Sequence, residues 1–406
     1  MRVLISAYAC EPGKGSEQGT GWNLVLRLAE RHDVTVVTRA NNQEVIEADL
    51  ADRKGLSLSF IYHDLGARVL RLKKKKIISV QLYYTLWLLT LNRRLYDEAD
   101  LESFDLVHHL TFNTFEIPPL FLRKVNALKV WGPVGGGQIA PANLTAALSA
   151  KALWKERFRG WRVRTSGWNP IIKATLLQCD LVLFANEETR DLLKEACQGS
   201  TGTMVDVGVD TNKFQKGQGG SGDQILFAGN FEHRKGARLV LWAFQQALQK
   251  RSSLRLKMLG DGPEWELEKE WVKAQGLEDS IDIPGRCTHA EMAEAFAKAD
   301  IFVFPSLRDT SGSIVLEAMA SEVPTVCLNH QGARLMVDDA SGIRVPVLSK
   351  EETIRGMADA FVTLADDQEL RQSMGKHARE RVIQNFGWES KATRLLKEYQ
   401  QLAEQS

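Results

Sequence analysis

Short apolar, β-branched runs alternate with helical patterns along the whole 406-residue chain. This alternation is typical of parallel α/β sheets, in which each strand is followed by a covering helix. We therefore predict six strands in each half of the chain. They are residues 3–7, 34–38, 58–62, 106–109, 129–131 and 181–185, then 225–228, 255–259, 281–284, 301–304, 325–328 and 343–345.

The chain is too long for one ordinary hydrophobic core, and the strand pattern divides it into two parts. Residues 217–222 read GQGGSG, the composition of a flexible linker. We expect domains at 1–217 and 222–387, each the size of one Rossmann-like domain, with a ligand cleft between them. Apolar residues at helical spacing predict a last helix in 388–406.

Composition narrows the class of protein. The content of 44% hydrophobic and 25% charged residues is that of a soluble globular protein, and a net charge of +1 argues against a general nucleic-acid binder. The N-terminus lacks the long apolar core of a secretion signal, so we expect a cytoplasmic protein. Five scattered cysteines without CxxC spacing indicate thiols, not a disulfide framework or a metal site: Cys10, Cys179, Cys197, Cys287 and Cys327.

The strongest functional signal is residues 301–320, IFVFPSLRDTSGSIVLEAMA. A strand is followed by a loop and then by a helix start, an arrangement that offers backbone N–H groups to a phosphate. We expect the anion site at Gly312, Ser313 and Ile314. Asp309 and Glu317 flank it, as carboxylates that bind hydroxyl groups would. The stretch predicts a nucleotide diphosphate that carries a polyhydroxylated group.

A glycine-rich loop, residues 13–21, follows the first predicted strand and precedes a helix. Its glycines allow close approach of a ligand, and we expect Lys14 and Gly15 to contact the substrate. The same spacing could be a dinucleotide fingerprint. Thr38 and Arg39 argue against NAD there, because no carboxylate for a ribose ends the second strand.

His108 and His109 lie at the carboxyl end of the strand 106–109, where a neutral imidazole can bond a sugar hydroxyl. We favour His109 and keep His108 as the alternative; a structural role is the competing interpretation. A shared metal is disfavoured, because adjacent strand residues face opposite ways.

Basic side chains follow the first strand of the second half in AGNFEHRKG, residues 228–236. Lys235 and Arg234 are candidates for binding phosphate, since an arginine fork suits phosphate oxygens. Asn230 lies in the same loop. Gly262 and Arg286 follow the next two strands and complete the expected substrate-binding set.

Together these motifs resemble the retaining glycosyltransferases of family 4 (glycosyl transferases group 1), most specifically over residues 225–345. In that family a lysine and an arginine neutralise the donor pyrophosphate. Lys235 matches the lysine. Asn230 stands at the arginine position, and Arg234 is expected to supply the missing charge. Asp309 stands where the family has the first of two glutamates. Gly15 matches the second glycine of the family's loop, and Lys14 stands in place of the first.

The other matches in this resemblance are weaker or shifted. Gly262 belongs to a GxGP turn, and Arg286 lies where the nucleotide base is usually bordered. The family's histidine usually stands five residues after the aspartate that matches Asp105, and that position is Leu110 here. The predicted sugar-binding histidines, His109 and His108, therefore stand one and two positions before the family's usual place.

The resemblance implies a GT-B fold of two Rossmann-like domains and a last helix that crosses back to the first domain. It implies transfer of a sugar, with retention of configuration, from a nucleotide-diphosphate-sugar donor to a saccharide or lipid-linked saccharide, in surface polysaccharide or glycolipid synthesis. The nucleotide sugar would be a co-substrate, with no metal and no further cofactor. Two alternatives stay open: a non-catalytic GT-B binding or scaffold subunit, and an NADP-dependent oxidoreductase. The sugar, base, acceptor and oligomeric state are not specified.

A basic run, Lys73–Lys76, precedes fifteen uncharged residues, 77–91. This is shorter than the ~20 apolar residues of a bilayer span. Cations beside Trp and Tyr suit an anionic membrane surface, so we expect either peripheral binding to the inner face of the cell membrane or a buried helix under solvated lysines. Residues 154–168 form a second basic and aromatic stretch, which could line the acceptor side or be a packed loop.

Overall fold

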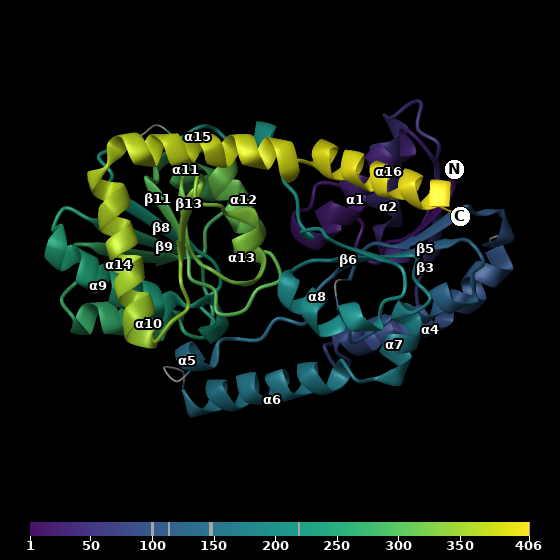
Figure 1. The fold of residues 1–406 in the computed structure, drawn as a ribbon, viewed down its shortest axis with the longest axis horizontal. Helices are drawn as coiled ribbons and strands as arrows, with labels where there is room; N and C mark the ends of the chain where they lie inside the picture. Colours follow the sequence, from purple (N-terminus) through teal and green to yellow (C-terminus); the bar gives the residue numbers. More distant parts are fainter. Residues whose placement is uncertain (99–100, 113, 146–148, 218–219, 406) are drawn as a thin grey trace. The chain divides into compact units, whose positions relative to one another are not determined.

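The computed structural model describes residues 1–406 except 99–100, 113, 146–148, 218–219 and 406. The chain forms two compact units (Figure 1). Unit 1 is Met1–Gly137, Val163–Val207 and Trp388–Ser406; unit 2 is Gln138–Arg162 and Gly208–Gly387. The division differs from the boundary expected at residue 217, because residues 138–162 pack with the second sheet. One point of the division, between Arg162 and Val163, falls inside the helix α6 (Ala150–Ser166).

Unit 1 is a parallel sheet with helices between its strands. The strand order β3-β2-β1-β4-β5-β6-β7 places β4 beside β1, so the chain reverses direction across the sheet at that pair. Its elements are β1 (Arg2–Ser6), α1 (Ser16–Ala29), β2 (Asp33–Arg39), α2 (Gln43–Ala51), β3 (Leu58–His63), α3 (Ala67–Lys74), α4 (Val80–Glu98), β4 (Leu106–His109), β5 (Leu128–Val134), α7 (Pro170–Leu176), β6 (Leu181–Phe184), α8 (Glu187–Leu193), β7 (Ser200–Thr203) and α16 (Trp388–Gln405).

The last helix, α16, packs along α1 in the core of unit 1 (Figure 1). Its apolar residues recur at helical spacing, and Trp388, Ala392, Leu395 and Tyr399 are buried. The buried ammonium of Lys391 donates to the backbone carbonyl of Val205. The C-terminal segment is therefore part of the first core.

Unit 2 contains a six-stranded parallel sheet of order β10-β9-β8-β11-β12-β13. Helices α9 and α14 pack side by side, and α12 packs along α15 (Figure 1). Its elements are α5 (Ala142–Thr145), β8 (Gln224–Ala228), α9 (Ala237–Lys250), β9 (Arg255–Leu259), α10 (Trp265–Ala274), β10 (Ile281–Gly285), α11 (His289–Lys298), β11 (Ile301–Phe304), α12 (Ser313–Ala320), β12 (Thr325–Leu328), α13 (Gln331–Met336), β13 (Gly342–Val345), α14 (Lys350–Asp366) and α15 (Gln368–Asn385).

All twelve predicted strands are present, and no end differs from its predicted position by more than three residues. The prediction missed β7, whose sequence is STGT. Two of its four residues are exposed and the other two half-buried, because β7 pairs only with β6 at the edge of the sheet. Small polar residues at an edge carry no apolar signal.

The predicted linker is anchored where the structure describes it; residues 218–219 lie outside the described part. The Gly217 N–H donates to the carbonyl of Ser321 at 2.7 Å. The backbone N–H groups of Gly220 and Gly222 donate to the Asp300 carboxylate at 2.8 and 3.1 Å. These bonds hold both described ends of the segment on unit 2, whereas composition alone had predicted a flexible linker.

Candidate functional site

The candidate site lies in unit 2 at the carboxyl edge of its sheet. The chain passes from β8 through β9 to β10 on one side and returns at β11 beside β8, so β8 and β11 form the topological switch point. Ligands of open α/β sheets bind at such points, outside the carboxyl ends of the strands. The β8–α9 loop (residues 229–236) and the β11–α12 loop (residues 305–312) meet there.

Lys235 and Asp309 join these two loops through an ion pair between Nζ and Oδ2. Arg234 adds a second cation: its Nη1 lies 3.9 Å from the same Oδ2, and its Nε donates to Glu232 Oε2 at 2.7 Å. The backbone N–H of Leu307 donates to the Arg234 carbonyl at 2.8 Å. Three predicted site residues are thus brought together, in a cluster with two positive side chains.

Gly312 precedes the first residue of α12 and has φ +85°, a left-handed conformation that favours glycine. A Cβ there would lie 2.6 Å from the Phe304 ring, so glycine is also required by space. The helix then begins at Ser313 and Ile314, whose N–H groups are in its first turn. The predicted strand, loop and helix start has formed.

Glu317 lies in α12 and is largely buried, although its residue remains partly accessible. Burial raises the pKa of its carboxyl above the ordinary value, and the charge of His289 opposes this shift. A largely buried carboxylate that remains partly accessible, on the helix that follows the expected anion site, is suited to accept hydroxyl hydrogen bonds.

Gly262 joins the β9–α10 loop to the β8–α9 loop. A Cβ on Gly262 would lie 2.6 Å from the carbonyl oxygen of Phe231, and the Phe231 N–H donates to the carbonyl of Asp261 at 2.8 Å. Asn230, directly before Phe231, is exposed and makes its described hydrogen bond through its backbone carbonyl. Arg286 contacts Asp261, with Nη2 and Oδ2 2.9 Å apart, and is 79% exposed.

Glu156, which sequence analysis did not select, connects both phosphate-side loops to α6. It is 5% exposed, and its carboxylate accepts hydrogen bonds from Arg308 Nε and Nη2, both at 3.0 Å. His233 Nε2 donates to Glu156 Oε1 at 2.9 Å. Burial alone would raise the pKa of Glu156, but these bonds hold it below its ordinary value. Glu156 therefore fixes the residues next to Asp309 and Arg234.

Gln331 orients Asp309 from a third strand end. Its Oε1 accepts the backbone N–H of Asp309 at 2.8 Å, and its Nε2 donates to the carbonyls of Ile139 and Leu307 at 3.0 and 3.2 Å. The residue is 4% exposed and has φ +54°. The sequence could not predict that Gln331 orients Asp309, because a single glutamine after a strand has no recognisable motif.

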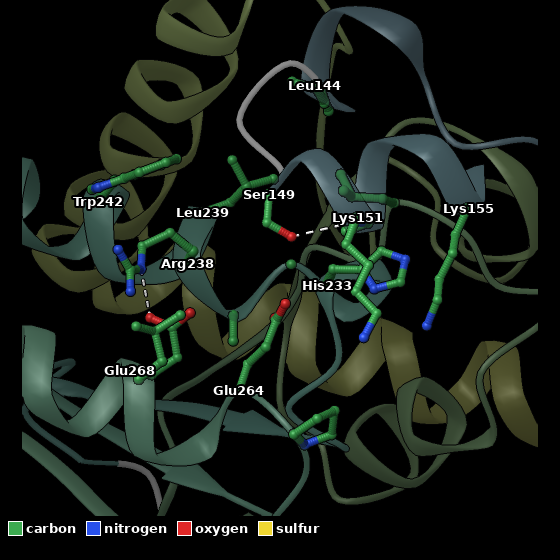
Figure 2. A pocket seen from close by; sticks show the side chains of 16 residues that line it. Leu144, Ser149, Lys151, Lys155, His233, Arg238, Leu239, Trp242, Glu264 and Glu268 are labelled. Carbon is green, nitrogen blue, oxygen red and sulfur yellow. Dashed lines mark hydrogen bonds and ion pairs between the residues drawn. The ribbon is translucent and has the colours of Figure 1, made fainter. Parts of the chain in front are cut away.

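A pocket of about 490 Å³ lies beside these loops, within unit 2 (Figure 2). In Figure 2 the Arg238 side chain points to Glu268, whose Oε2 is 2.5 Å from Arg238 Nε. Both carboxyls in the pocket, Glu264 and Glu268, have pKa values raised by burial. The lining residues are Leu144, Ser149, Lys151, Ala152, Lys155, His233, Gly236, Ala237, Arg238, Leu239, Trp242, Pro263, Glu264, Leu267, Glu268 and Leu307.

Lys14 and Gly15 lie in unit 1, at the start of α1. Gly15 is the residue before the helix, and a Cβ there would meet no atom within 4 Å, so the loop is open at this point. Lys14 is half-exposed, with Nζ 3.7 Å from Glu11 Oε1. Gly19 and Gly21 have a structural reason instead: a Cβ on either would overlap a backbone carbonyl.

His108 and His109 are buried in unit 1, and all four ring nitrogens have protein partners. His108 Nε2 is 2.6 Å from the Gly132 carbonyl and Nδ1 is 2.5 Å from Tyr399 Oη. His109 Nε2 is 2.8 Å from Tyr84 Oη and Nδ1 is 3.1 Å from Ser6 Oγ. The rings do face opposite sides of the strand. Both rings make protein contacts, and the expected contact with a sugar hydroxyl stays a prediction.

For the segment 70–91 we expected either a membrane-surface stretch or a buried helix, and its aromatic residues belong to the core. Tyr83, Tyr84 and Trp87 of α4 are fully buried in unit 1. Lys73 also points inward: its Nζ donates to Tyr8 Oη at 3.1 Å, and burial lowers its pKa. The neighbours Lys74–Lys76 are exposed. Among the described residues, no helix has both the length and the apolarity to cross a bilayer.

Arg39 follows the second strand, where an arginine would be compatible with the NADP alternative, but its side chain contacts Tyr8. Its Nε donates to the Tyr8 carbonyl at 3.1 Å, and its guanidinium lies 4.8 Å from the centre of the Tyr8 ring.

In the described part of the chain, no three His, Cys, Asp or Glu side chains are grouped to hold a metal ion.

Residues 209–381, which include the whole candidate site of unit 2, match the family model described as glycosyl transferases group 1. The match covers less than half of the chain, and we call residues 209–381 the group 1 domain after it. The group 1 domain therefore contains Lys235, Asp309, Gly312 and Glu317 at the switch point of its sheet. The sequence resemblance that named this family is confirmed.

The curated relatives of this chain include several proteins named as glycosyltransferases. The chain is 32% identical over 190 residues to a D-inositol 3-phosphate glycosyltransferase of Kineococcus radiotolerans, covering 43% of each protein. The chain thus spans less than half the length of this curated relative.

Two solved structures resemble the whole chain. A sucrose-phosphate synthase of Thermosynechococcus elongatus matches with a TM-score of 0.68 at 18% identity, over 100% of both chains. HepE of Anabaena, determined in complex with UDP, matches with a TM-score of 0.62 at 14% identity, over 98% of this chain and 99% of HepE. At these identities the likeness establishes the fold. The fold is GT-B, with two Rossmann-like sheets of seven and six strands, as the sequence resemblance implied.

Proposed function

We propose that this chain is a glycosyltransferase that moves a sugar from a nucleotide-diphosphate-sugar donor to a saccharide acceptor. The observation that carries the proposal is the cluster of Lys235, Arg234 and Asp309 at the β8/β11 switch point. It lies within the segment that matches the group 1 family. The names of the curated relatives and the UDP in the HepE complex support a nucleotide-sugar donor.

In the proposed reaction the bond between the anomeric carbon and a diphosphate oxygen breaks, and the acceptor hydroxyl oxygen bonds to that carbon. The proton of the hydroxyl passes to the departing diphosphate. Negative charge grows on the diphosphate, and we assign its stabilisation to Lys235, Arg234 and the first N–H groups of α12. Preorganised positive groups of this kind commonly supply the largest catalytic effect.

The two carboxylates have separate proposed roles. Glu317 would accept hydrogen bonds from the ribose hydroxyls, and Asp309 would accept them from the transferred sugar. Asp309 also bonds to Lys235, which places a sugar-binding group and a phosphate-binding group in direct contact. Displacing either by ~1 Å could lower the rate ~100-fold.

We further propose retention of configuration and independence of metal ions, both from the family resemblance. Nuclear magnetic resonance of the product, recorded before the anomers equilibrate, distinguishes retention from inversion. Turnover in excess chelator, compared with turnover after each divalent cation is returned, tests the metal. An inverted product or a strict requirement for a cation would contradict these two proposals while leaving glycosyl transfer intact.

The acceptor is proposed to be a saccharide or a lipid-linked saccharide, in the synthesis of a surface polysaccharide or glycolipid. Exposed lysines in unit 1, Lys74–Lys76, could contact anionic lipid headgroups at such a membrane. Lys73 is excluded from that set because it packs against Tyr8 and Tyr83.

The deciding experiment is a donor screen in which release of nucleoside diphosphate is measured for a panel of nucleotide sugars. We expect turnover, or slow hydrolysis without acceptor, for one donor class and its loss in Lys235→Ala. Lys250→Ala, which removes an exposed lysine paired with Asp359, is the matched control. Binding of nucleotide sugar without turnover would favour the scaffold alternative, and binding of NADPH alone would favour an oxidoreductase.

A further inference from the structure

One face of α6 is buried and anchored within unit 2. Ala152, Glu156 and Gly160 follow each other at intervals of four residues and are all buried. The Glu156 carboxylate makes the contacts with Arg308 and His233 described above. The helix is therefore fixed to unit 2 along this face, and its opposite face is directed away from it.

That opposite face carries three large aromatic side chains, which we call the aromatic strip: Trp154, Phe158 and Trp161. They are 66%, 48% and 60% exposed. Trp154 and Phe158 stack with ring centres 5.6 Å apart and planes at 8°, and Phe158 and Trp161 are 5.9 Å apart. Single exposed apolar residues are ordinary, but contiguous apolar patches mark interaction sites.

Positive charge surrounds the aromatic strip. The exposed residues of this part of α6 include Lys151, Lys155, Arg157 and Arg162. Its one acidic residue, Glu156, is buried and already paired. The surface thus combines aromatic and cationic groups with no exposed carboxylate from the helix itself. A partner with an apolar interior and an anionic surface is complementary to it.

We propose that α6 docks on an anionic lipid bilayer, with the helix axis in the plane of the membrane and the aromatic strip among the headgroups. Tryptophan favours this interface, and amphipathic helices with basic margins bind it through apolar burial together with charge. The proposal adds a lipid-contacting surface in unit 2, separate from Lys74–Lys76 of unit 1, and it stands whether or not the chain transfers sugar.

The opposite faces of α6 connect docking with the candidate site. Glu156 holds the residues preceding Asp309 and Arg234, and the aromatic strip begins two residues earlier on the same helix. A helix fixed at the bilayer would hold these loops near the membrane surface. An acceptor carried on a lipid would then be within reach of the donor loops.

The test is flotation of the full chain with vesicles of phosphatidylcholine alone or mixed with phosphatidylglycerol. The main variant replaces Trp154, Phe158 and Trp161 together by serine. A matched control replaces Leu348 and Ile383, exposed apolar residues of unit 2 outside α6, by serine. A charge variant, Lys155→Glu with Arg157→Glu, is compared with Lys273→Glu and Lys376→Glu, and each protein's circular dichroism and melting temperature are recorded.

We expect the parent to bind the mixed vesicles at low salt, and binding to weaken about tenfold or more in the strip variant and in the charge variant. Both controls should bind as the parent does. Hydrolysis of a soluble donor should stay unchanged in the strip variant. High salt should weaken the parent's binding, because surface charges are screened within about 10 Å at 0.1 M salt.

Three results would overturn the inference. One is a parent that does not bind mixed vesicles at low salt. Another is a strip variant that binds vesicles as well as the parent does, while a triple variant with Lys74→Gln, Lys75→Gln and Lys76→Gln does not bind. This result would place the lipid-binding surface in unit 1 and would not affect the proposed sugar transfer. The third is binding of the strip to a soluble acidic polysaccharide but not to vesicles, which would make it a saccharide-binding surface.

Discussion

Glu156 and Arg308 form a two-point contact in unit 2: the carboxylate accepts from Nε and from Nη2 of the guanidinium, at 3.0 Å each. Such a fork fixes the direction of both side chains as well as their separation. Because Arg308 directly precedes Asp309, this contact makes the position of Asp309 depend on the position of α6. His233, which precedes Arg234, is bound by the same carboxylate.

We predict that Glu156→Gln lowers the stability of unit 2 and the turnover of donor together. Removing one partner of a buried ion pair costs about 3 kcal/mol, because the other charge stays buried without compensation. Denaturant unfolding followed by circular dichroism measures the loss, and nucleotide release measures the effect on turnover. Glu294→Gln, which removes an exposed carboxylate paired with Lys298, is the control and should change neither. Parental stability and turnover in Glu156→Gln would show that the bridge does not position the loops.

The fold was predictable because the central strands of both sheets, such as β1, β4, β8 and β11, are buried on both faces and form clear apolar runs. Lys235 and Asp309 were predictable for a related reason: each follows such a strand, where ligand-binding residues of parallel sheets lie. Glu156 was not, since a glutamate among lysines and arginines on a helix looks like a solvated surface residue. Its partners lie 77 and 152 residues further along the chain.

For residues 77–91 the sequence left a membrane-surface segment and a buried helix open. Its apolar residues occur all round the helix, so the sequence could not tell which of them face the core. The structure buries Tyr83, Tyr84 and Trp87, and exposes Leu82 and Leu89. The contacts of the predicted linker were also not predictable, because composition gave no indication that Asp300 would accept hydrogen bonds from the glycine N–H groups.

We predict that Lys235→Ala and Glu317→Ala each lower turnover ~100-fold or more, while folding is retained. Lys235 contacts Asp309 at the edge of the sheet, and Glu317 remains partly accessible, so each can serve the ligand. Steady-state rates of nucleotide release measure the effect, with the melting temperature as the check on folding. If either purified variant turns over at the parental rate, its assignment to the site is wrong.

For Asp309 we predict that Asp309→Ala lowers kcat more than it raises KM for the donor. The substitution leaves Lys235 free to bind phosphate, but it removes the acceptor for the sugar hydroxyls and thus orientation of the reacting carbon. Asp309→Glu should keep most of the activity, with a modest change in sugar preference, since the family carries glutamate there. Asp359→Ala, which breaks an exposed lysine–aspartate pair in the same unit, serves as control. A parental kcat/KM in Asp309→Ala would exclude a role for this carboxylate in transfer.

The last prediction concerns acid stability, through His108. Its Nε2–H donates to the Gly132 carbonyl, so Nδ1 carries the lone pair that accepts from Tyr399 O–H. Burial lowers the pKa of His108 from its ordinary value of 6.5 to about 4. Between these two values the unfolded chain binds a proton that the folded chain refuses, so stability falls as pH decreases from 6.5 towards about 4.

The slope from this one group is about 1.4 kcal/mol per pH unit, and its contribution is complete above pH 6.5. His108→Gln removes the titrating group, so its stability should lie below that of the parent at neutral pH, and the difference should shrink steadily as the pH falls. Tyr399→Phe keeps the histidine and should keep the acid dependence. Denaturant unfolding of the three proteins from pH 7.5 to about 4.5 measures these curves. A difference between parent and His108→Gln that is independent of pH would contradict this prediction, because it would mean that burial leaves the pKa of His108 unchanged on folding.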